Sequence, residues 1–399
     1  MKIGVLLENP IHVGGGFNQA LNAILQLRRL VGERHTVVVY TTIHANLEHL
    51  QRLKIDAAIL ASDAVLMDRV IRGVSRRIGL NQGDQGKAAR RIEQALLANG
   101  VDLAYFVTHS STPNYFRKLN YITTVLDLCH RDNLEFPEVG ANGQFAERDQ
   151  HFATCLPRAF AITVASRQLV EKIVTRYGVD YERMVAMPFE PSPFLTEEHS
   201  IARDEVLNSH ELTFGYYFYP AQFWPHKNHI RILEALAILM KRMGPQADLR
   251  VVFSGGDQGN LGWIKRQAER LGVADRVRFL GFVPAEHVRA LYEGALAVVM
   301  SSYFGPTNIP PLEAWALGRP LVYSAHLSEQ IGDAALLANA DDAQAWADSM
   351  EKIRDPMLAG GLVERGHQQL KAVELERSFA EQELLRKLEQ FAQRRECWE

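Results

Sequence analysis

The chain has 399 residues, of which 47% are hydrophobic and 23% are charged, and its formal net charge is −3. This length suits two domains, and the composition is that of an ordinary globular protein. The slight negative charge argues against a protein that binds nucleic acid through an overall positive field.

The N-terminal half alternates short apolar runs with helical patterns, which is typical of a parallel sheet covered by helices on both faces. The predicted strands are Lys2–Leu7, His35–Tyr40, Ala57–Leu60, Leu103–Val107, Tyr121–Leu126 and Ala161–Val164, and the predicted helices are Asn18–Val31, Ala64–Arg77, Gly86–Asn99 and Ser166–Tyr177.

A Pro-rich segment, Met187–Pro193, and the polar stretch Thr196–Ser209 interrupt this pattern and are predicted to link two domains. The alternation then restarts, and the chain ends in a charged amphipathic helix, Glu374–Gln393, that no strand follows. We therefore expect an α/β protein with two doubly wound, Rossmann-like domains and a ligand cleft between them. The predicted strands of the second half are Leu212–Tyr217, Leu249–Ser254, Val277–Leu280, Ala297–Met300 and Pro320–Tyr323, with helices at His229–Arg242, Leu261–Leu271, Ala285–Glu293, Pro311–Leu317 and from Asp342 onward.

The stretch Ser301–Pro320 is predicted to contain a strand end, a Gly/Pro/Asn turn and a helix that opens at Pro310–Pro311. A helix start presents N–H groups and a positive dipole end, which favour phosphate. Glu313 is expected in the first turn, where a carboxylate can cap the helix or bind the two hydroxyls of a ribose. The loop therefore indicates a site for a nucleoside diphosphate and its sugar.

Three other segments of the second half follow predicted strands. Lys227, in Pro225–Asn228, could place a positive charge against a diphosphate, or it could be a solvent-exposed lysine beside a helix cap. Gly255 and Gly256 allow close backbone approach to a ligand, although a simple tight turn is the favoured interpretation. Phe282 and Val283 could contact a base or belong to a structural turn.

In the first half, glycines 14–16 stand between a strand and a helix and leave room for a phosphate or sugar, so Gly15 and Gly16 are candidate binding residues. Their spacing is not that of a dinucleotide-binding motif, which disfavours a dehydrogenase. Asp127 and His130 follow another predicted strand and could face the cleft, although a lone histidine is more often structural.

These motifs together resemble the retaining GT-B glycosyltransferases of family 4. The resemblance implies that a domain at residues 205–370 binds the nucleotide sugar, that residues 1–195 bind the acceptor, and that a helix at residues 371–399 packs on the N-domain. It further implies that Lys227 contacts the diphosphate, that Glu313 binds the ribose, and that backbone groups of Thr307, Asn308 and Ile309 receive the phosphate or sugar. The resemblance extends over Lys227-Asn228, Val251–Gly256, Val277–Val283, Pro310–Ala314, Gly318–Pro320 and Gly332–Leu337.

The chain departs from the family pattern at three positions. Gly305 stands where the family has the first Glu of its motif, Gln222 where it has an Arg, and Leu126 where it has a His. The form of the loop around Gly305 resembles that of polysaccharide mannosyl- and rhamnosyltransferases. From the resemblance as a whole, the candidate catalytic residues are Lys227, Glu313 and Asp127. Gln222 is a candidate contact to the substrate.

The expected reaction transfers a hexose or deoxyhexose from a nucleotide sugar to a glycan or lipid-linked acceptor with retention of configuration, in surface polysaccharide synthesis. No metal or other cofactor is implied, because Lys227 and the helix start supply the positive charge. The alternatives are a non-catalytic subunit that binds nucleotide sugars and a GT-B epimerase.

The cellular location is inferred from cysteines, apolar runs and a basic segment. Cys129, Cys155 and Cys397 are widely separated, which favours a reducing cytoplasm. The first apolar run is too short for a signal peptide, and none approaches the roughly 20 residues of a membrane span. A basic segment could lie on anionic lipid at the inner face of the plasma membrane or form a solvated helix face. Its cations are Arg69, Arg72, Arg76, Arg77, Lys87, Arg90 and Arg91.

Overall fold

The computed structural model describes residues 1–10, 15–60, 82–196, 201–305 and 307–398, and it divides into two compact units. Unit 1 contains Met1–Leu128, Phe145–Pro188 and Glu376–Glu399, and unit 2 contains Cys129–Gln144 and Phe189–Leu375. Residues 1–195 were predicted to form one domain, whereas the structure groups Cys129–Gln144 and residues 189–195 with unit 2.

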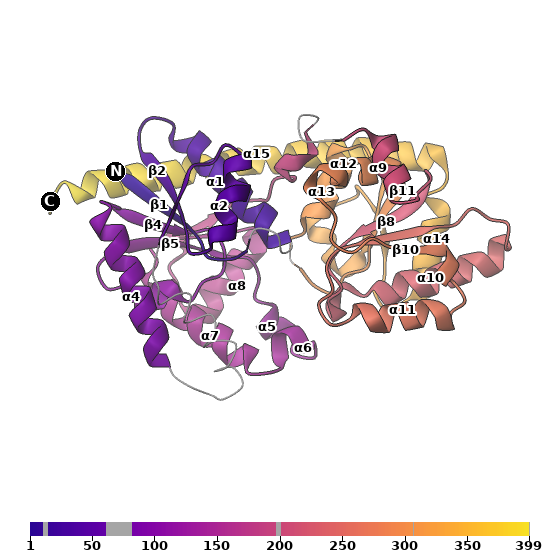
Figure 1. Ribbon diagram of the computed structural model, residues 1–399, viewed down its shortest axis with the longest axis horizontal. Coiled ribbons are helices and arrows are strands. Elements are labelled where there is room, and N and C mark those ends of the chain that lie inside the picture. Colours follow the sequence, from indigo (N-terminus) through magenta and orange to yellow (C-terminus); the bar gives the residue numbers. More distant parts are fainter. Residues whose placement is uncertain (11–14, 61–81, 197–200, 306, 399) are drawn as a thin grey trace. The chain divides into compact units, whose positions relative to one another are not determined.

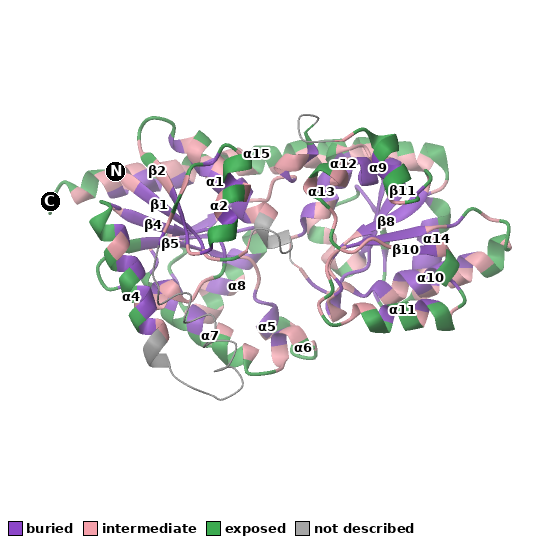
Figure 2. Ribbon diagram, viewed as in Figure 1, coloured by how far each residue is buried: buried purple, intermediate pink, exposed green. Residues whose placement is uncertain are grey.

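The described part of unit 1 forms a seven-stranded sheet in the order β3-β2-β1-β4-β5-β6-β7, in which every pair of strands is parallel. Most residues of its inner strands are buried (Figure 2), as expected for a sheet covered on both faces. In chain order (Figure 1) the elements are β1 (Lys2–Leu7), α1 (Gly15–Val31), β2 (Thr36–Thr41), α2 (His44–Arg52), β3 (Ala57–Ile59), α4 (Gln82–Ala98), β4 (Leu103–Phe106), β5 (Asn120–Val125), α7 (Gln144–Cys155), β6 (Ala161–Val164), α8 (Arg167–Tyr177) and β7 (Met184–Ala186).

The described part of unit 2 forms a six-stranded parallel sheet in the order β10-β9-β8-β11-β12-β13. Two short helices of the chain's first half, α5 (Cys129–Asp132) and α6 (Pro137–Gly140), belong to this unit. The other elements are α9 (Arg203–Ser209), β8 (Tyr216–Pro220), α10 (His229–Met243), β9 (Val251–Ser254), α11 (Leu261–Arg270), β10 (Val277–Phe279), α12 (Ala285–Gly294), β11 (Ala295–Met300), α13 (Ile309–Ala316), β12 (Leu321–Ser324), β13 (Leu336–Ala338), α14 (Ala343–Lys352) and α15 (Pro356–Arg395), which begins in this unit.

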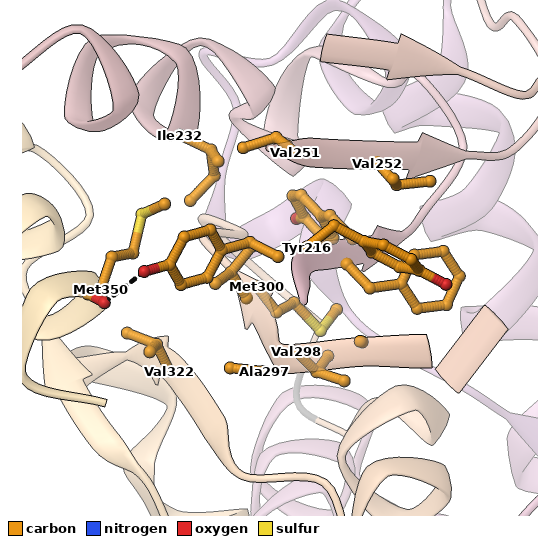
Figure 3. Packing of buried hydrophobic residues seen from close by; sticks show 14 of the residues in the cluster. Tyr216, Ile232, Val251, Val252, Ala297, Val298, Met300, Val322 and Met350 are labelled. Carbon is orange, nitrogen blue, oxygen red and sulfur yellow. Dashed lines mark hydrogen bonds between the residues drawn. The ribbon is translucent and has the colours of Figure 1, made fainter. Parts of the chain in front are cut away.

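The core of unit 2 surrounds its central strand, β8, in which four consecutive aromatic residues, 216–219, are fully buried. Figure 3 shows Tyr216 among aliphatic side chains of the neighbouring strands and of α10. The hydroxyl of Tyr217 donates a hydrogen bond of 2.5 Å to the carbonyl of Met350 at the end of α14, so the phenol is satisfied inside the core. This packing fixes β8, whose carboxyl end leads into the candidate site.

Most predicted strands agree with the structure to within one or two residues, and β1 and β6 agree completely. The prediction for β8 was shifted by four residues at its start, because the positive φ angles of Glu211 (54°) and Gly215 (94°) turn the chain before Tyr216. The strands β7 and β13, of three residues each, were not predicted. The expected linker contains a helix, α9, and the helix predicted at residues 64–77 lies outside the described residues.

The C-terminal helix α15 has 40 residues and begins at Pro356, well before the predicted terminal helix Glu374–Gln393. Its first part packs in unit 2, where a Cβ on Gly366 would lie 2.2 Å from the indole of Trp315. Its last part belongs to unit 1, in which Glu389 pairs with Arg34 at 2.7 Å and Phe391 contacts Phe160. Within the described residues, no helix combines the length and apolar character needed to cross a membrane.

Candidate functional site

The candidate site lies where the connections of the unit 2 sheet change direction. From β8 the chain proceeds through β9 and β10 on one side, and from the neighbouring strand β11 it proceeds through β12 and β13 on the other. In such sheets ligands bind beyond the carboxyl ends of the two strands that flank this switch point. The loop after β8 carries Lys227, and the loop after β11 carries Asn308.

The turn that carries Lys227 is held by hydrogen bonds to several strands. The hydroxyl of Tyr219, on β8, donates to the Lys227 carbonyl at 2.7 Å. Asn228 adopts a left-handed conformation (φ 53°), and its amide nitrogen donates to the carbonyls of Ser301 (3.1 Å) and Ala340 (2.9 Å). Asn228 therefore does not cap α10 with its side chain, and instead it ties this turn to the ends of β11 and β13.

Lys227 reaches across the switch point to Asn308. The half-buried Lys227 places Nζ 3.4 Å from the Asn308 Oδ1. The amide nitrogen of Asn308 donates to the Tyr323 hydroxyl at 2.6 Å, which fixes the amide orientation. Gln330 holds the backbone of the same residue, because its Oε1 accepts from the Asn308 N–H (2.9 Å) and its Nε2 donates to the Asn308 carbonyl (2.6 Å). Sequence reasoning identified both Lys227 and Asn308 but missed Tyr323 and Gln330.

Gly305 adopts a conformation that only glycine tolerates well. Its φ is +121°, and a Cβ at this position would lie 3.0 Å from the Asn308 Oδ1. The Asn308 amide donates to the Gly305 carbonyl at 3.0 Å, so the two residues pack as one turn. A glutamate at position 305 is therefore incompatible with this loop conformation.

The start of α13 offers fewer N–H groups than its position suggests. The helix begins at Ile309, and the next two residues, Pro310 and Pro311, carry no N–H. The Asn308 N–H is engaged by Gln330. In the described residues, the buried hydroxyl oxygen of Thr307 makes no hydrogen bond. The expectation that Thr307, Asn308 and Ile309 receive phosphate or sugar stays a prediction, with the Ile309 N–H and the Thr307 hydroxyl as its main candidates.

Glu313 lies in the second turn of α13 and not in the first, because the helix begins at Ile309. It is 5% exposed, and its Oε2 accepts a 2.5 Å hydrogen bond from the hydroxyl of Tyr292 on α12. Burial raises the pKa of Glu313 above its ordinary value, although hydrogen bonds from Tyr292 and the Ser192 backbone oppose this. Glu313 is thus no helix cap, and its expected contact with a ribose stays a prediction.

The glycine pair after β9 has a structural role in this conformation. Gly255 has a φ of +138°, and a Cβ there would lie 2.4 Å from the carbonyl oxygen of Ala221. The Gly256 carbonyl accepts from the N–H of Phe223, so this loop pairs with the segment that follows β8. These contacts support the interpretation as a tight turn, while binding of a ligand by Gly255 or Gly256 stays a prediction.

Gln222 lies in that same segment, and its Oε1 accepts from the indole nitrogen of Trp224 at 3.0 Å. At the end of β10, Phe282 is 63% exposed and Val283 is half-buried. The exposed ring of Phe282 is compatible with stacking on a base. The contacts proposed for these residues stay predictions.

The candidate residues of the first half fall in different units. Asp127, in unit 1, pairs with Arg148 of α7 at 3.0 Å. His130 is fully buried on α5 and belongs to unit 2. Gly15 and Gly16 form the start of α1, and the preceding residues 11–14 lie outside the described part of the chain.

Sequence reasoning missed a polar cluster at the switch point of the unit 1 sheet, between β1 and β4. Glu8, directly after β1, accepts hydrogen bonds from the hydroxyls of Ser110 and Thr112. His151, on α7, contacts Asn114 at 3.1 Å, and burial together with the nearby charges of His109 and Arg148 lowers its pKa to about 3. The signal was present in the sequence, because polar residues directly follow two predicted strands.

Residues 205–356 match the family described as "Glycosyl transferases group 1". That region of the chain is therefore similar to the group 1 glycosyltransferases. The match covers both flanks of the unit 2 switch point, including Lys227, Asn308 and Glu313. Among the described residues, no group of three or more His, Cys, Asp or Glu side chains is arranged to hold a metal ion.

Two of the curated relatives each match about a third of the chain. The chain is 31% identical over 131 residues to the D-inositol 3-phosphate glycosyltransferase of Corynebacterium diphtheriae, covering 31% of this chain and 30% of that protein. It is 32% identical over 145 residues to the O-antigen chain mannosyltransferase B of Escherichia coli, covering 35% of this chain and 37% of that protein. The chain thus spans about a third of these relatives.

A solved structure matches the whole chain. Anabaena HepE, in complex with UDP and glucose, superposes with a TM-score of 0.68 at 16% sequence identity, covering 98% of this chain and 100% of that one. At this identity the likeness shows the fold, which is the two-unit Rossmann-like GT-B fold. The expected fold class is thereby confirmed.

Proposed function

We propose that this chain is a glycosyltransferase that moves a mannose- or rhamnose-type sugar from a nucleoside-diphosphate sugar to a glycan or lipid-linked acceptor in surface polysaccharide synthesis. The observation that carries the proposal is the contact between Lys227 and Asn308 across the switch point of the unit that matches the family. The name of the O-antigen relative supports a mannose-type sugar, and the UDP and glucose in the HepE structure support a nucleotide-sugar substrate.

The proposed reaction proceeds with retention of configuration. The bond between the anomeric carbon and the diphosphate oxygen breaks, and its electron pair stays on the departing oxygen. The acceptor hydroxyl forms a new bond to that carbon on the same face and gives its proton to the departing phosphate. Lys227 and the positive end of α13 stabilise the charge that develops on the diphosphate, so the proposal includes neither a metal cofactor nor a side-chain base.

The Lys227→Ala variant tests this role. Loss of one preorganised cation should lower turnover of a nucleotide sugar by about 10²-fold or more, with the fold unchanged by circular dichroism. Lys241→Ala is the matched control, because Lys241 is an exposed lysine in the last turn of α10. Transfer by Lys227→Ala at the wild-type rate would contradict the proposal.

A second candidate function is a non-catalytic subunit that binds nucleotide sugars. It is favoured by Gln222, whose side chain is engaged with Trp224, and by Gly305, because neither position supplies the charged group of the family pattern. Incubation with a panel of nucleotide sugars distinguishes the functions. Slow hydrolysis of the nucleotide sugar indicates a transferase, interconversion of sugars indicates an epimerase, and binding alone indicates a subunit.

We further propose a cytoplasmic location with attachment to anionic lipid through the basic segment. In its described part, Lys87, Arg90 and Arg91 are exposed on α4, while Ala88 and Ile92 face the core. The arginines at 69, 72, 76 and 77 lie outside the described residues. Flotation with vesicles containing anionic lipid should show binding that weakens with salt, and no binding at low salt would contradict this location.

A further inference from the structure

The segment 129–144 packs against the loop that follows β11, within unit 2. Cys129 and Val139 of this segment form a buried apolar cluster with Phe304. The ring of Phe136 meets the ring of Phe304 edge-on at 5.2 Å between centroids and lies 5.4 Å from that of Tyr303. This packing brings α6 next to the two loops that carry Lys227 and Asn308.

Glu138, on α6, binds the residue that precedes Lys227. Its Oε1 accepts from the backbone N–H of His226 at 3.0 Å and contacts the ring Nδ1 of His226 at 2.6 Å. The two side chains are 7% and 11% exposed, respectively. Burial raises the pKa of Glu138, but hydrogen bonds, chiefly from His226, more than offset this, and the net pKa lies below its ordinary value. The ionised carboxylate can only accept, so Nδ1 carries the proton.

His226 is held on its other sides as well. Its ring stacks on that of Phe304, with centroids 3.9 Å apart and an interplanar angle of 13°. Its carbonyl accepts from the N–H of Tyr303 at 2.8 Å. His226 therefore links α6, the loop after β8 and the loop after β11, and it is covalently adjacent to Lys227.

The carboxylate of Glu138 is not explained by a contribution to the stability of the fold. The second oxygen of Glu138 is buried and has no hydrogen-bond partner among the described residues. A buried acceptor without a partner destabilises the fold, and the surrounding cluster is apolar. Glu138 instead fixes the orientation of His226, because one of its carboxylate oxygens binds both the backbone N–H and the ring of that residue.

We propose that Glu138 is a positioning residue of the site for the donor sugar, which fixes the His226–Lys227 turn so that the Lys227 ammonium is held at the switch point. This inference rests on the proposed function, in which Lys227 contacts the diphosphate. Glu138 touches neither substrate nor product in this role and acts through His226.

The test measures the binding of UDP and GDP to the full chain by calorimetry. Glu138→Ala should weaken binding of the nucleoside diphosphate about 10-fold, the equivalent of losing one charge-assisted hydrogen bond. Glu138→Gln keeps an acceptor oxygen and should lose less. Glu135→Ala is the matched control, because Glu135 is exposed in the same segment and should bind as the wild type does.

A double-mutant cycle separates positioning from a general effect on the fold. If Glu138 acts through Lys227, then Glu138→Ala should have less than about a 2-fold effect in a Lys227→Ala background. An equal loss in both backgrounds, or wild-type binding by Glu138→Ala, would overturn the inference. If Glu138→Ala does not fold, Glu138→Gln is taken through the same cycle with the same criteria. If the wild type itself binds no nucleoside diphosphate, the proposed function fails instead.

Discussion

Replacing Gly305 by alanine should destabilise unit 2 and disturb the Lys227 contact. A non-glycine residue at a φ of +121° is strained by about 1–3 kcal/mol. The added Cβ would also lie 3.0 Å from the Asn308 Oδ1, so the amide must move, and we expect the loss of one of its hydrogen bonds, worth about 1 kcal/mol. The expected destabilisation is therefore roughly 2–4 kcal/mol.

Thermal unfolding followed by circular dichroism, together with calorimetry of UDP and GDP binding, measures both effects. For a unit of this size the melting temperature should fall by roughly 5–15 °C. Gly360→Ala is the control, because Gly360 is an exposed helical glycine with open space around its Cβ position, and alanine should stabilise it. An unchanged melting temperature for Gly305→Ala would refute the conformation on which this reasoning depends.

Three further outcomes are expected. Gly255→Ala should lower the melting temperature more than Gly305→Ala does, because the added Cβ would meet backbone atoms of Ala221. Thermal unfolding measures this, with Gly360→Ala as the control. The pKa of Glu313 is raised in the folded state, so its ionisation opposes folding as the pH rises above 4.5. Glu313→Gln should therefore be more stable than the wild type at pH 7, and this difference in stability should shrink towards pH 4.5. A difference that does not depend on pH would contradict this. The pKa of His151 is lowered from 6.5 to about 3 in the folded state, so the free energy of unfolding of the wild type should decrease as the pH falls between these values. His151→Gln should reduce this dependence on pH by up to about 1.4 kcal/mol per pH unit, as measured by denaturant titrations.

The sequence predicted those parts of the fold and site that depend on local pattern. Buried parallel strands read as apolar runs, so β1, β6 and most others could be placed, and their carboxyl ends located Lys227 and Asn308. Four of the described strands have only three residues, and two of them, β7 and β13, were missed because so short a run carries no distinct period. The sequence also shows that Pro310 and Pro311 carry no N–H, but the prediction assumed free N–H groups at this helix start in addition to its dipole.

The remaining parts depend on contacts between residues far apart in the chain, which no local pattern reveals. Gln330 binds the Asn308 backbone from 22 residues away, and Glu138 binds His226 from 88 residues away. Tyr292 could not be identified as the partner of Glu313, because an aromatic residue in a helix predicts burial and not a particular hydrogen bond. The grouping of Cys129–Gln144 with unit 2 has the same origin in tertiary packing.

One departure from the family pattern, the glycine at position 305, is explained by its contact with Asn308. A side chain at position 305 would project onto the Asn308 amide, and that amide contacts Lys227 through Oδ1 and binds Tyr323 through Nδ2. Glycine at 305 is therefore what lets Asn308 orient the lysine. Restoring a glutamate at 305 alone would strain the backbone and displace the amide before it could add a carboxylate to the site. In this loop, an amide and a buried tyrosine hydroxyl therefore orient the lysine, and glycine at position 305 leaves the space they need.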